Sequence, residues 1–194
     1  MRERLGLLGG TFDPPHVGHL FVAYTALEQL GLSAVRLIPA FQQPLKRAGG
    51  TTAAEHRLAM TRLLAAVDPR LSVDTIEIER GGLSYTIDTV RAYRATQPKA
   101  ELVLLLGSDV ADTLPQWRES VALAAEARIV VVSRGDEGEG PAEAGVAVER
   151  LQSRRVDISA SEIRARVRDG LPIHGFVPDA IADYIATHGL YRTT

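Results

Sequence analysis

Two histidines near the start of the chain have the spacing and the side-chain chemistry to act on a phosphate group. His16 and His19 are three residues apart, so on a helix both side chains would project from one face of the first turn. Gly18, between them, leaves room for an anion. Imidazole groups can donate hydrogen bonds to a phosphorus centre on which negative charge develops. The pair therefore predicts a site of phosphate chemistry at the beginning of a helix.

The residues before the histidines favour the same kind of site. A short apolar stretch at residues 5–9 leads into the run Gly9-Gly10-Thr11-Phe12-Asp13-Pro14-Pro15. Glycine lets the backbone approach a ligand closely, and a helix N-terminus offers amide hydrogens and the positive end of the helix dipole. We therefore expect a phosphate-binding loop between the first strand and the first helix.

Other interpretations of these residues are weaker. A lone buried histidine is more often structural than functional, and a pair of glycines alone indicates only a turn. Histidines at this spacing also bind metal ions, but no third ligand is placed to complete a metal site, so we predict none held by the protein. The Gly-x-Gly-x-x-Gly pattern of dinucleotide-binding oxidoreductases is missing.

A second candidate anion site lies near the end of the chain, in the run Ile158-Ser159-Ala160-Ser161-Glu162-Ile163-Arg164. Ser159 is a good helix N-cap, and Glu162 three residues later would complete a capping box. That structural role does not explain Arg164, and it leaves the hydroxyl of Ser161 for other uses. A helix start with a hydroxyl and a guanidinium nearby suits the outer phosphates of a nucleoside triphosphate.

The apolar pattern along the chain indicates the elements that position these residues. It predicts strands at residues 5–9, 35–38, 71–79, 102–106 and 129–132, and helices at about 16–30, 59–67, 86–96, 159–169 and 178–188. Strands that alternate with helices predict an α/β fold with a Rossmann-like, doubly wound and mostly parallel sheet, whose ligand site lies at the carboxyl ends of the strands. We expect one domain over residues 1–194, with a core at 1–150 and a C-terminal helical segment at 151–194.

Composition excludes several classes of protein. The chain of 194 residues is 45% hydrophobic and 24% charged, with a net charge of −2, so it can bury a core and has no overall attraction for nucleic acid or an anionic membrane. It has no cysteine, which excludes disulfides and thiolate chemistry. The apolar stretch near the N-terminus is too short for a signal peptide, and no other run approaches membrane-spanning length. We expect a soluble, cytoplasmic protein.

The two motifs together resemble those of a nucleotidyltransferase superfamily. The run from Gly9 to His19 is similar to its signature with a (His/Thr)-x-Gly-His motif. The run from Ile158 to Arg164 is similar to its Ile-Ser-Ser-Thr-x-Ile-Arg motif, with Ala160 where serine is common and Ser161 where threonine is common. The second difference keeps a hydroxyl. The first removes any side-chain contact that a serine at position 160 would make.

Between these motifs, the chain resembles bacterial nicotinate-mononucleotide adenylyltransferases. The resemblance is carried by Ser84-Tyr85-Thr86-Ile87-Asp88-Thr89-Val90, by Gly107-Ser108-Asp109 and by Leu114-Pro115-Gln116-Trp117. The C-terminal Val177-Pro178-Asp179, Tyr184-Ile185 and Gly189-Leu190-Tyr191 also match that family. The resemblance covers nearly the whole chain and is weakest over residues 134–150.

Trp117, the only tryptophan, bears on the acceptor substrate. A tryptophan often packs in a core, but indole is also the best surface for stacking a cationic pyridine ring, and the matching residue of the family does so. The resemblance implies that the acceptor contacts Ser84, Tyr85, Thr86, Trp117 and Arg118, partly through main-chain amides. Many relatives have an aromatic residue in place of Arg118, whose guanidinium would either strengthen the binding of a carboxylate or face solvent.

The family's other site residues map onto this chain by position. The resemblance implies catalytic roles for His16, His19, Lys46 and Arg164. It implies ATP contacts at Gly9, Gly10, Thr11, Phe12, Gly18, His19, Gly107, Asp109, Arg134, Ile158, Ser161 and Arg164. The family's loop often ends Pro-Pro-His-Lys, whereas this chain reads Gln43-Pro44-Leu45-Lys46. Asp109 also fits a helix N-cap, and Lys46 with Arg47 also fits a solvated loop.

The reaction that the resemblance implies is transfer of an adenylyl group from ATP to nicotinate mononucleotide, with Mg²⁺ held mainly by the substrate phosphates. Two alternatives stay open. The chain could be another adenylyl- or cytidylyltransferase of the superfamily, such as one that acts on phosphopantetheine, against which Trp117 and Ser84-Tyr85-Thr86 argue. It could also be a non-catalytic nucleotide sensor. The sequence is compatible with a homo-oligomer.

Overall fold

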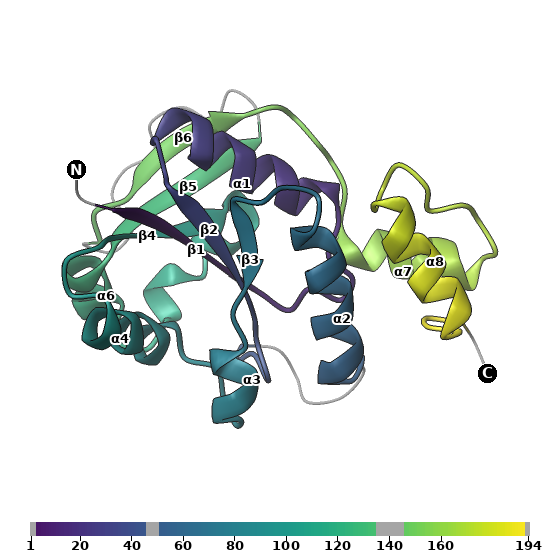
Figure 1. The fold of residues 1–194 in the computed structure, drawn as a ribbon, viewed down its shortest axis with the longest axis horizontal. Helices are drawn as coiled ribbons and strands as arrows, with labels where there is room; N and C mark the ends of the chain where they lie inside the picture. Colours follow the sequence, from purple (N-terminus) through teal and green to yellow (C-terminus); the bar gives the residue numbers. More distant parts are fainter. Residues whose placement is uncertain (1–2, 46–50, 135–145, 193–194) are drawn as a thin grey trace.

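The computed structural model describes residues 3–45, 51–134 and 146–192, without the side chains of Asp109 and Arg134. A six-stranded sheet with the order β3-β2-β1-β4-β5-β6 forms its centre (Figure 1). The strands are β1 (Arg4–Gly10), β2 (Ala34–Pro39), β3 (Leu71–Val73), β4 (Glu101–Gly107), β5 (Arg128–Arg134) and β6 (Glu149–Ser153). All pairings in this sheet are parallel, and the order reverses between β1 and β4. This is the Rossmann-like, doubly wound α/β fold that the sequence predicts.

Each central strand is apolar on both faces, because helices cover the sheet on both sides. Val103 and Leu105 of β4 pack into one cluster, whereas Leu102, Leu104 and Leu106 pack into the other. β5 alternates in the same way. Successive side chains of a strand point to opposite faces, so a strand buried on both faces has to be apolar throughout. This explains the continuous apolar runs in the sequence.

Helices α1 (Val17–Gln29), α2 (Ala54–Ala65), α7 (Ala160–Arg168) and α8 (Asp179–Thr187) contribute residues to the first cluster. Helices α4 (Thr86–Thr96) and α6 (Ser120–Glu126) pack with the second cluster on the opposite face (Figure 1). Three shorter helical segments complete the described elements: α3 (Ile76–Arg80), α5 (Ser108–Ala111) and the 3₁₀ turn η1 (Leu114–Gln116). No helix in the described ranges has the length and apolar character needed to cross a membrane.

The strand expected at residues 71–79 is only partly correct. β3 ends at Val73, and α3 begins at Ile76 after two connecting residues. The change occurs at Asp74, whose side chain accepts a hydrogen bond from the Ile76 N–H at 2.9 Å. Such a side-chain bond turns the backbone out of the extended conformation. The alternating polar and apolar residues therefore belong to a short strand followed by a short helix in which only Glu77 is buried.

β6 is an element that the apolar pattern does not predict. The apolar pattern predicts only helices after residue 150, whereas Glu149–Ser153 pairs with β5. Among these five residues only Leu151 is buried. An edge strand is stabilised mainly by backbone hydrogen bonds to its single neighbour, so its side-chain pattern carries little signal.

Candidate functional site

The first motif leaves the sheet where the order of strands reverses. Gly9 and Gly10 end β1, beside Gly107 at the end of β4. A Cβ atom on Gly9 would meet nothing within 4 Å, so the backbone is open there, whereas on Gly10 it would lie 3.2 Å from the ring of Phe12. Phe12 is buried and has a positive φ of 52°. The chain thus makes a tight turn into the crevice where doubly wound sheets bind ligands.

The two histidines lie together at the start of α1. His16 is the N-cap residue, and its ring centroid lies 3.9 Å from that of His19. The N–H of His16 donates a hydrogen bond to Nδ1 of His19 at 3.1 Å. Because Nδ1 accepts, a neutral His19 must carry its proton on Nε2. This contact therefore orients His19 as a donor through Nε2, which is the form suited to phosphate oxygens.

The start of α1 offers fewer amide donors than the motif predicts. The N–H of Val17 donates to the carbonyl of Phe176 at 3.0 Å, and that of His19 donates to the carbonyl of His16 at 2.9 Å. Gly18, between them, is buried. Any anion held here would therefore depend more on the imidazole side chains than on the helix terminus.

The second motif lies against the first. Arg164, in α7, donates from Nη1 to the carbonyl oxygen of Asp13 at 2.7 Å, across a sequence separation of 151 residues. The N-cap role of Ser159 is confirmed, because its hydroxyl accepts the Glu162 N–H at 3.1 Å. The Ser161 hydroxyl lies 3.0 Å from that of Ser159, and Ile158 packs at the edge of the first cluster. The structure thus brings the two predicted anion sites together.

Asp13 connects three segments, a role that the sequence analysis does not assign to it. Its carboxylate accepts the N–H of Thr52 at 3.1 Å and the hydroxyl of Tyr191 at 2.7 Å. Burial, followed by the nearby charge of Asp13, raises the pKa of Tyr191 above its ordinary value, so this tyrosine stays a hydrogen-bond donor at neutral pH. Both residues lie inside motifs that resemble the family, which is the only signal in the sequence.

Arg57 is a second residue that the sequence analysis does not identify. It is only 2% exposed and donates to four carbonyl oxygens: those of Thr52, Thr11, Ala40 and Phe41. Burial lowers the pKa of its guanidinium, while the charge of Asp13 raises it. A buried arginine among backbone carbonyls holds several loops in one arrangement.

The residues expected to bind the acceptor lie around the start of α4. Tyr85 is its N-cap and Thr86 its first residue. The guanidinium of Arg118 lies over the ring of Tyr85, 4.9 Å from its centroid, and 3.6 Å from the carboxylate of Asp88. Arg118 therefore has a cation–π partner and an ionic partner within the protein. Its predicted contact with a substrate carboxylate would compete with these.

Trp117 is partly buried against the second cluster. Its Nε1–H donates to the hydroxyl of Thr113 at 2.9 Å. Ser84 is 7% exposed, and its hydroxyl accepts the N–H of Phe41 at 3.0 Å. Ser84 therefore supports the neighbouring backbone, and its side chain points to protein rather than to an open site.

Several predicted residues have a described backbone only or lie outside the described ranges. Gly107 is the N-cap of α5, so Asp109 is the second residue of that helix and not its cap. Arg134 ends β5 and pairs with Ser153 of β6. Lys46 lies outside the described residues.

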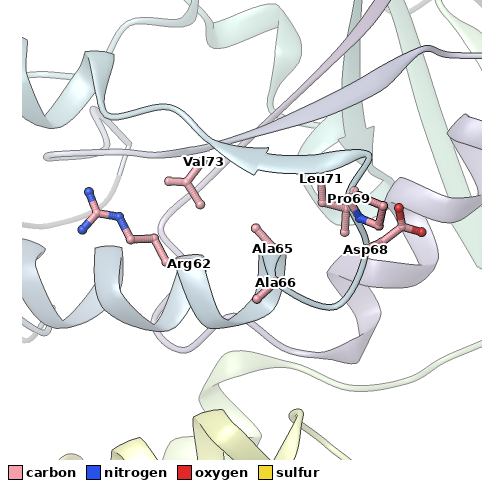
Figure 2. Close-up of a pocket in the computed structure, with 7 residues that line it drawn as sticks. All are labelled: Arg62, Ala65, Ala66, Asp68, Pro69, Leu71 and Val73. Atoms are coloured by element: carbon pink, nitrogen blue, oxygen red, sulfur yellow. The ribbon is translucent and has the colours of Figure 1, made fainter.

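An open hollow lies apart from these residues, between the end of α2 and β3 (Figure 2). Its lining includes Leu71 and Val73 of β3, and its charged residues are Arg62 and Asp68. It lies at the edge of the sheet, away from the crevice between β1 and β4, and it contains none of the predicted site residues.

Comparisons with known proteins agree with this architecture. The cytidylyltransferase-like family matches residues 7–166. The probable nicotinate-nucleotide adenylyltransferase of Gemmatimonas aurantiaca is 54% identical, over 97% of this chain and 92% of the relative. That of Herpetosiphon aurantiacus is 45% identical, over 97% and 98%.

A solved structure shares the fold. The Plasmodium falciparum nicotinic acid mononucleotide adenylyltransferase, complexed with NaAD, matches with a TM-score of 0.79 at 18% identity, over 97% of both chains. With full-length relatives at about half identity and a matching fold, the chain belongs to the nicotinate-nucleotide adenylyltransferase family, within the cytidylyltransferase-like proteins.

Proposed function

We propose that this protein transfers the adenylyl group of ATP to nicotinate mononucleotide, releasing pyrophosphate and forming nicotinate adenine dinucleotide. Similarity to the family along almost the whole chain supports this reaction. The observation that carries it is the 2.7 Å contact between Arg164 and the carbonyl of Asp13. This contact joins the two proposed anion-binding motifs beside His16 and His19. One nucleoside triphosphate could then span both motifs.

The chemistry needs no covalent intermediate. The phosphate of the acceptor is ionised at neutral pH and attacks the α-phosphorus of ATP in line, while the bond to pyrophosphate breaks. The protein has to position two anions and stabilise the charge that develops on the transferred and leaving groups. In this assignment His16 and His19 donate hydrogen bonds to the α-phosphate region. Ser161, Arg164 and Lys46 contact the outer phosphates.

We assign the binding of the acceptor to the segment at the start of α4 and to Trp117. Trp117 would stack on the pyridine ring, while Thr86 and Arg118 would bind its carboxylate, partly through main-chain N–H groups. Tyr85 would shape this subsite through its contact with Arg118, and Ser84 would contribute by supporting the backbone. Gly107 and Asp109 would lie beside the nucleotide, with Arg134 near the adenosine.

A divalent cation fits this site through the substrate. Among the described residues, no group of three or more His, Asp or Glu side chains could hold a metal ion. The Asp13 carboxylate already accepts two hydrogen bonds from protein groups. We therefore propose Mg²⁺ bound mainly by phosphate oxygens and water, which is usual for this ion. It would neutralise charge on the leaving pyrophosphate.

Composition supports the remaining parts of the proposal. A net charge of −2 favours small-molecule substrates over nucleic acid as partners. The absence of cysteine is compatible with a cytoplasmic location, where disulfides are rare.

The test is pyrophosphate release from ATP and Mg²⁺ with a panel of acceptors: nicotinate mononucleotide, nicotinamide mononucleotide and phosphopantetheine. We expect turnover with nicotinate mononucleotide and much less with phosphopantetheine, which lacks a pyridine ring. Turnover with phosphopantetheine alone would replace the acceptor, and ATP binding without any turnover would identify a nucleotide sensor.

A variant on α7 and its matched control test the role of Arg164 in the ATP site. Arg164→Ala should raise the KM for ATP and lower kcat, because it removes both a phosphate contact and the link to Asp13. Arg168→Ala, on the same helix but exposed, is the matched control and should behave like the parent protein. If Arg164→Ala raised only the KM for the acceptor, this arginine would serve the acceptor and not ATP.

A further inference from the structure

Three residues after β2 connect the two proposed substrate subsites. The N–H of Ala40 donates to the carbonyl of Gly10 at 2.8 Å, in the phosphate-binding motif. On the other side, the N–H of Phe41 donates to the hydroxyl of Ser84 at 3.0 Å, and the N–H of Ser84 donates to the carbonyl of Gln42 at 2.8 Å. The backbone at residues 40–42 is therefore hydrogen-bonded to both subsites at once.

Arg57 holds this segment from the nucleotide side. Its Nη1 donates to the carbonyls of Ala40 at 2.6 Å and Thr11 at 2.9 Å, and its Nη2 donates to that of Phe41 at 3.1 Å. The planar guanidinium presents its donors in a fixed fork, so these oxygens are held at a set spacing. One buried side chain thus ties the first motif to residues 40 and 41.

On the acceptor side, Glu77 holds α4, and Ser84, just before that helix, is hydrogen-bonded to the segment. Glu77 is 6% exposed and accepts the hydroxyl of Thr89 at 2.7 Å. Burial raises the pKa of its carboxyl, and hydrogen bonds from Thr89 and Ser84 lower it. The N–H of Thr89 in turn donates to the carbonyl of Tyr85 at 3.4 Å, next to Ser84. Glu77 is thereby linked to the start of α4, whose preceding residue Ser84 accepts from Phe41.

We propose that Ala40, Phe41 and Gln42 form a strut that fixes the separation of the two substrates, and that Arg57 and Glu77 are the positioning residues that hold it. This proposal rests on the proposed function. Neither side chain needs to touch a substrate. Loosening the strut would leave each substrate able to bind its own subsite, but it would impair the in-line alignment of the acceptor phosphate with the α-phosphorus. Displacements of about 1 Å can cost up to a hundredfold in rate.

The variants are Arg57→Lys, Glu77→Gln and the pair combined. Lysine keeps the charge but cannot bond several carbonyls in a fixed plane, and glutamine keeps the size of the side chain without its charge. Arg62→Lys on α2 and Glu79→Gln on α3 make the same changes at exposed positions and serve as matched controls. Ser84→Ala interrupts the strut without altering a charged residue, and thermal unfolding establishes which variants are folded.

The measurements are kcat and both KM values in the pyrophosphate assay, and the Kd of each substrate alone. We expect Arg57→Lys, Glu77→Gln and Ser84→Ala each to lower kcat by about tenfold or more, with KM and Kd values changing less than about threefold, while the controls match the parent. The double variant should lose about as much as the more impaired single variant, since both act through one segment.

Three outcomes would each contradict this proposal. They are an unchanged kcat in the folded variants, a change confined to the KM of one substrate, and fully multiplicative losses of kcat in the double variant. A parent protein that releases no pyrophosphate with nicotinate mononucleotide would instead refute the proposed function.

Discussion

His19 shows how a single residue depends on its neighbours. Its Nδ1 accepts the His16 N–H, and its ring lies 4.9 Å from that of Phe12, so it is oriented before any substrate arrives. We predict that His19→Ala lowers kcat by about a hundredfold or more, as the loss of one preorganised donor does. Loss of the acceptor for His16 should cost about 1 kcal/mol of stability.

Steady-state kinetics and denaturant unfolding check this prediction together. His188→Ala, at an exposed histidine of the C-terminal region, is the control. A folded His19→Ala protein with nearly normal turnover would remove His19 from the catalytic residues.

Trp117 is the residue on which the identity of the acceptor depends most. It packs against the second cluster with its Nε1–H bonded to Thr113, which holds the indole plane in place. Stacking of a cationic ring on indole contributes about 0.5–2 kcal/mol, and more in a desolvated site. We therefore predict that Trp117→Ala raises the acceptor KM by about tenfold or more and leaves that of ATP nearly unchanged.

Fluorescence tests the same contact in the parent protein, because Trp117 is its only tryptophan. The emission should change with nicotinate mononucleotide and not with ATP alone. Thr113→Val, which removes the hydrogen-bond partner of Nε1, should weaken acceptor binding, but less than Trp117→Ala does. No fluorescence response at saturating acceptor, with an unchanged acceptor KM in Trp117→Ala, would make Trp117 an ordinary core residue and leave the acceptor open.

At the level of elements, α3 contains a carboxyl group whose pKa is linked to stability. Burial raises the pKa of Glu77 above its ordinary value of 4.5, hydrogen bonds from Thr89 and Ser84 and the charge of Arg80 lower it, and the charge of Asp74 raises it. Because the net shift is upward, the folded protein binds this proton more tightly than the unfolded chain does. Its contribution to stability is therefore complete below about pH 4.5 and is lost as pH rises through the raised pKa.

We predict from this linkage that Glu77→Gln gains stability relative to the parent protein as pH rises above 4.5. Free energies of unfolding measured between acid and neutral pH check it, with the exposed Glu79→Gln as the control. A difference between parent and Glu77→Gln that stays constant with pH would show that the carboxyl titrates alike in the folded and unfolded states.

For the whole molecule, the contacts of the C-terminal region argue for one cooperative unit. Ile163, Ile181 and Ile185 belong to the same cluster as residues of β1, β4 and β5, and Tyr191 and Arg164 both contact Asp13. We predict a single unfolding transition, with coincident curves from Trp117 fluorescence and from far-ultraviolet circular dichroism. Trp117 lies with the opposite cluster, so a separate C-terminal domain would appear as a second transition in the dichroism alone.

The sequence predicts the architecture best where burial is most complete. The runs at residues 102–106 and 129–132 are apolar throughout because both faces of those strands are covered. The structure confirms both as strands, and also residues 35–38, where Arg36 is the one polar residue. The apolar pattern does not predict β6, because an edge strand needs few apolar residues. It extends β3 over α3, because the Asp74 carboxylate, which accepts the Ile76 N–H, ends the strand early. The pairing of β6 with β5 is a contact between separate segments, which a local pattern of apolar residues does not contain.

By itself the sequence determined the α/β fold, the family, and the motifs that contain His16, His19 and Arg164, because these depend on residue types at short, fixed spacings. Only the tertiary structure decided that Arg164 and Tyr191 both meet Asp13, that Arg57 donates to the carbonyls of residues 40 and 41, and that Glu77 accepts the hydroxyl of Thr89. The reason is physical: a buried arginine or glutamate is defined by the distant carbonyls and hydroxyls that satisfy it. Those partners come together only when the sheet forms and its loops converge.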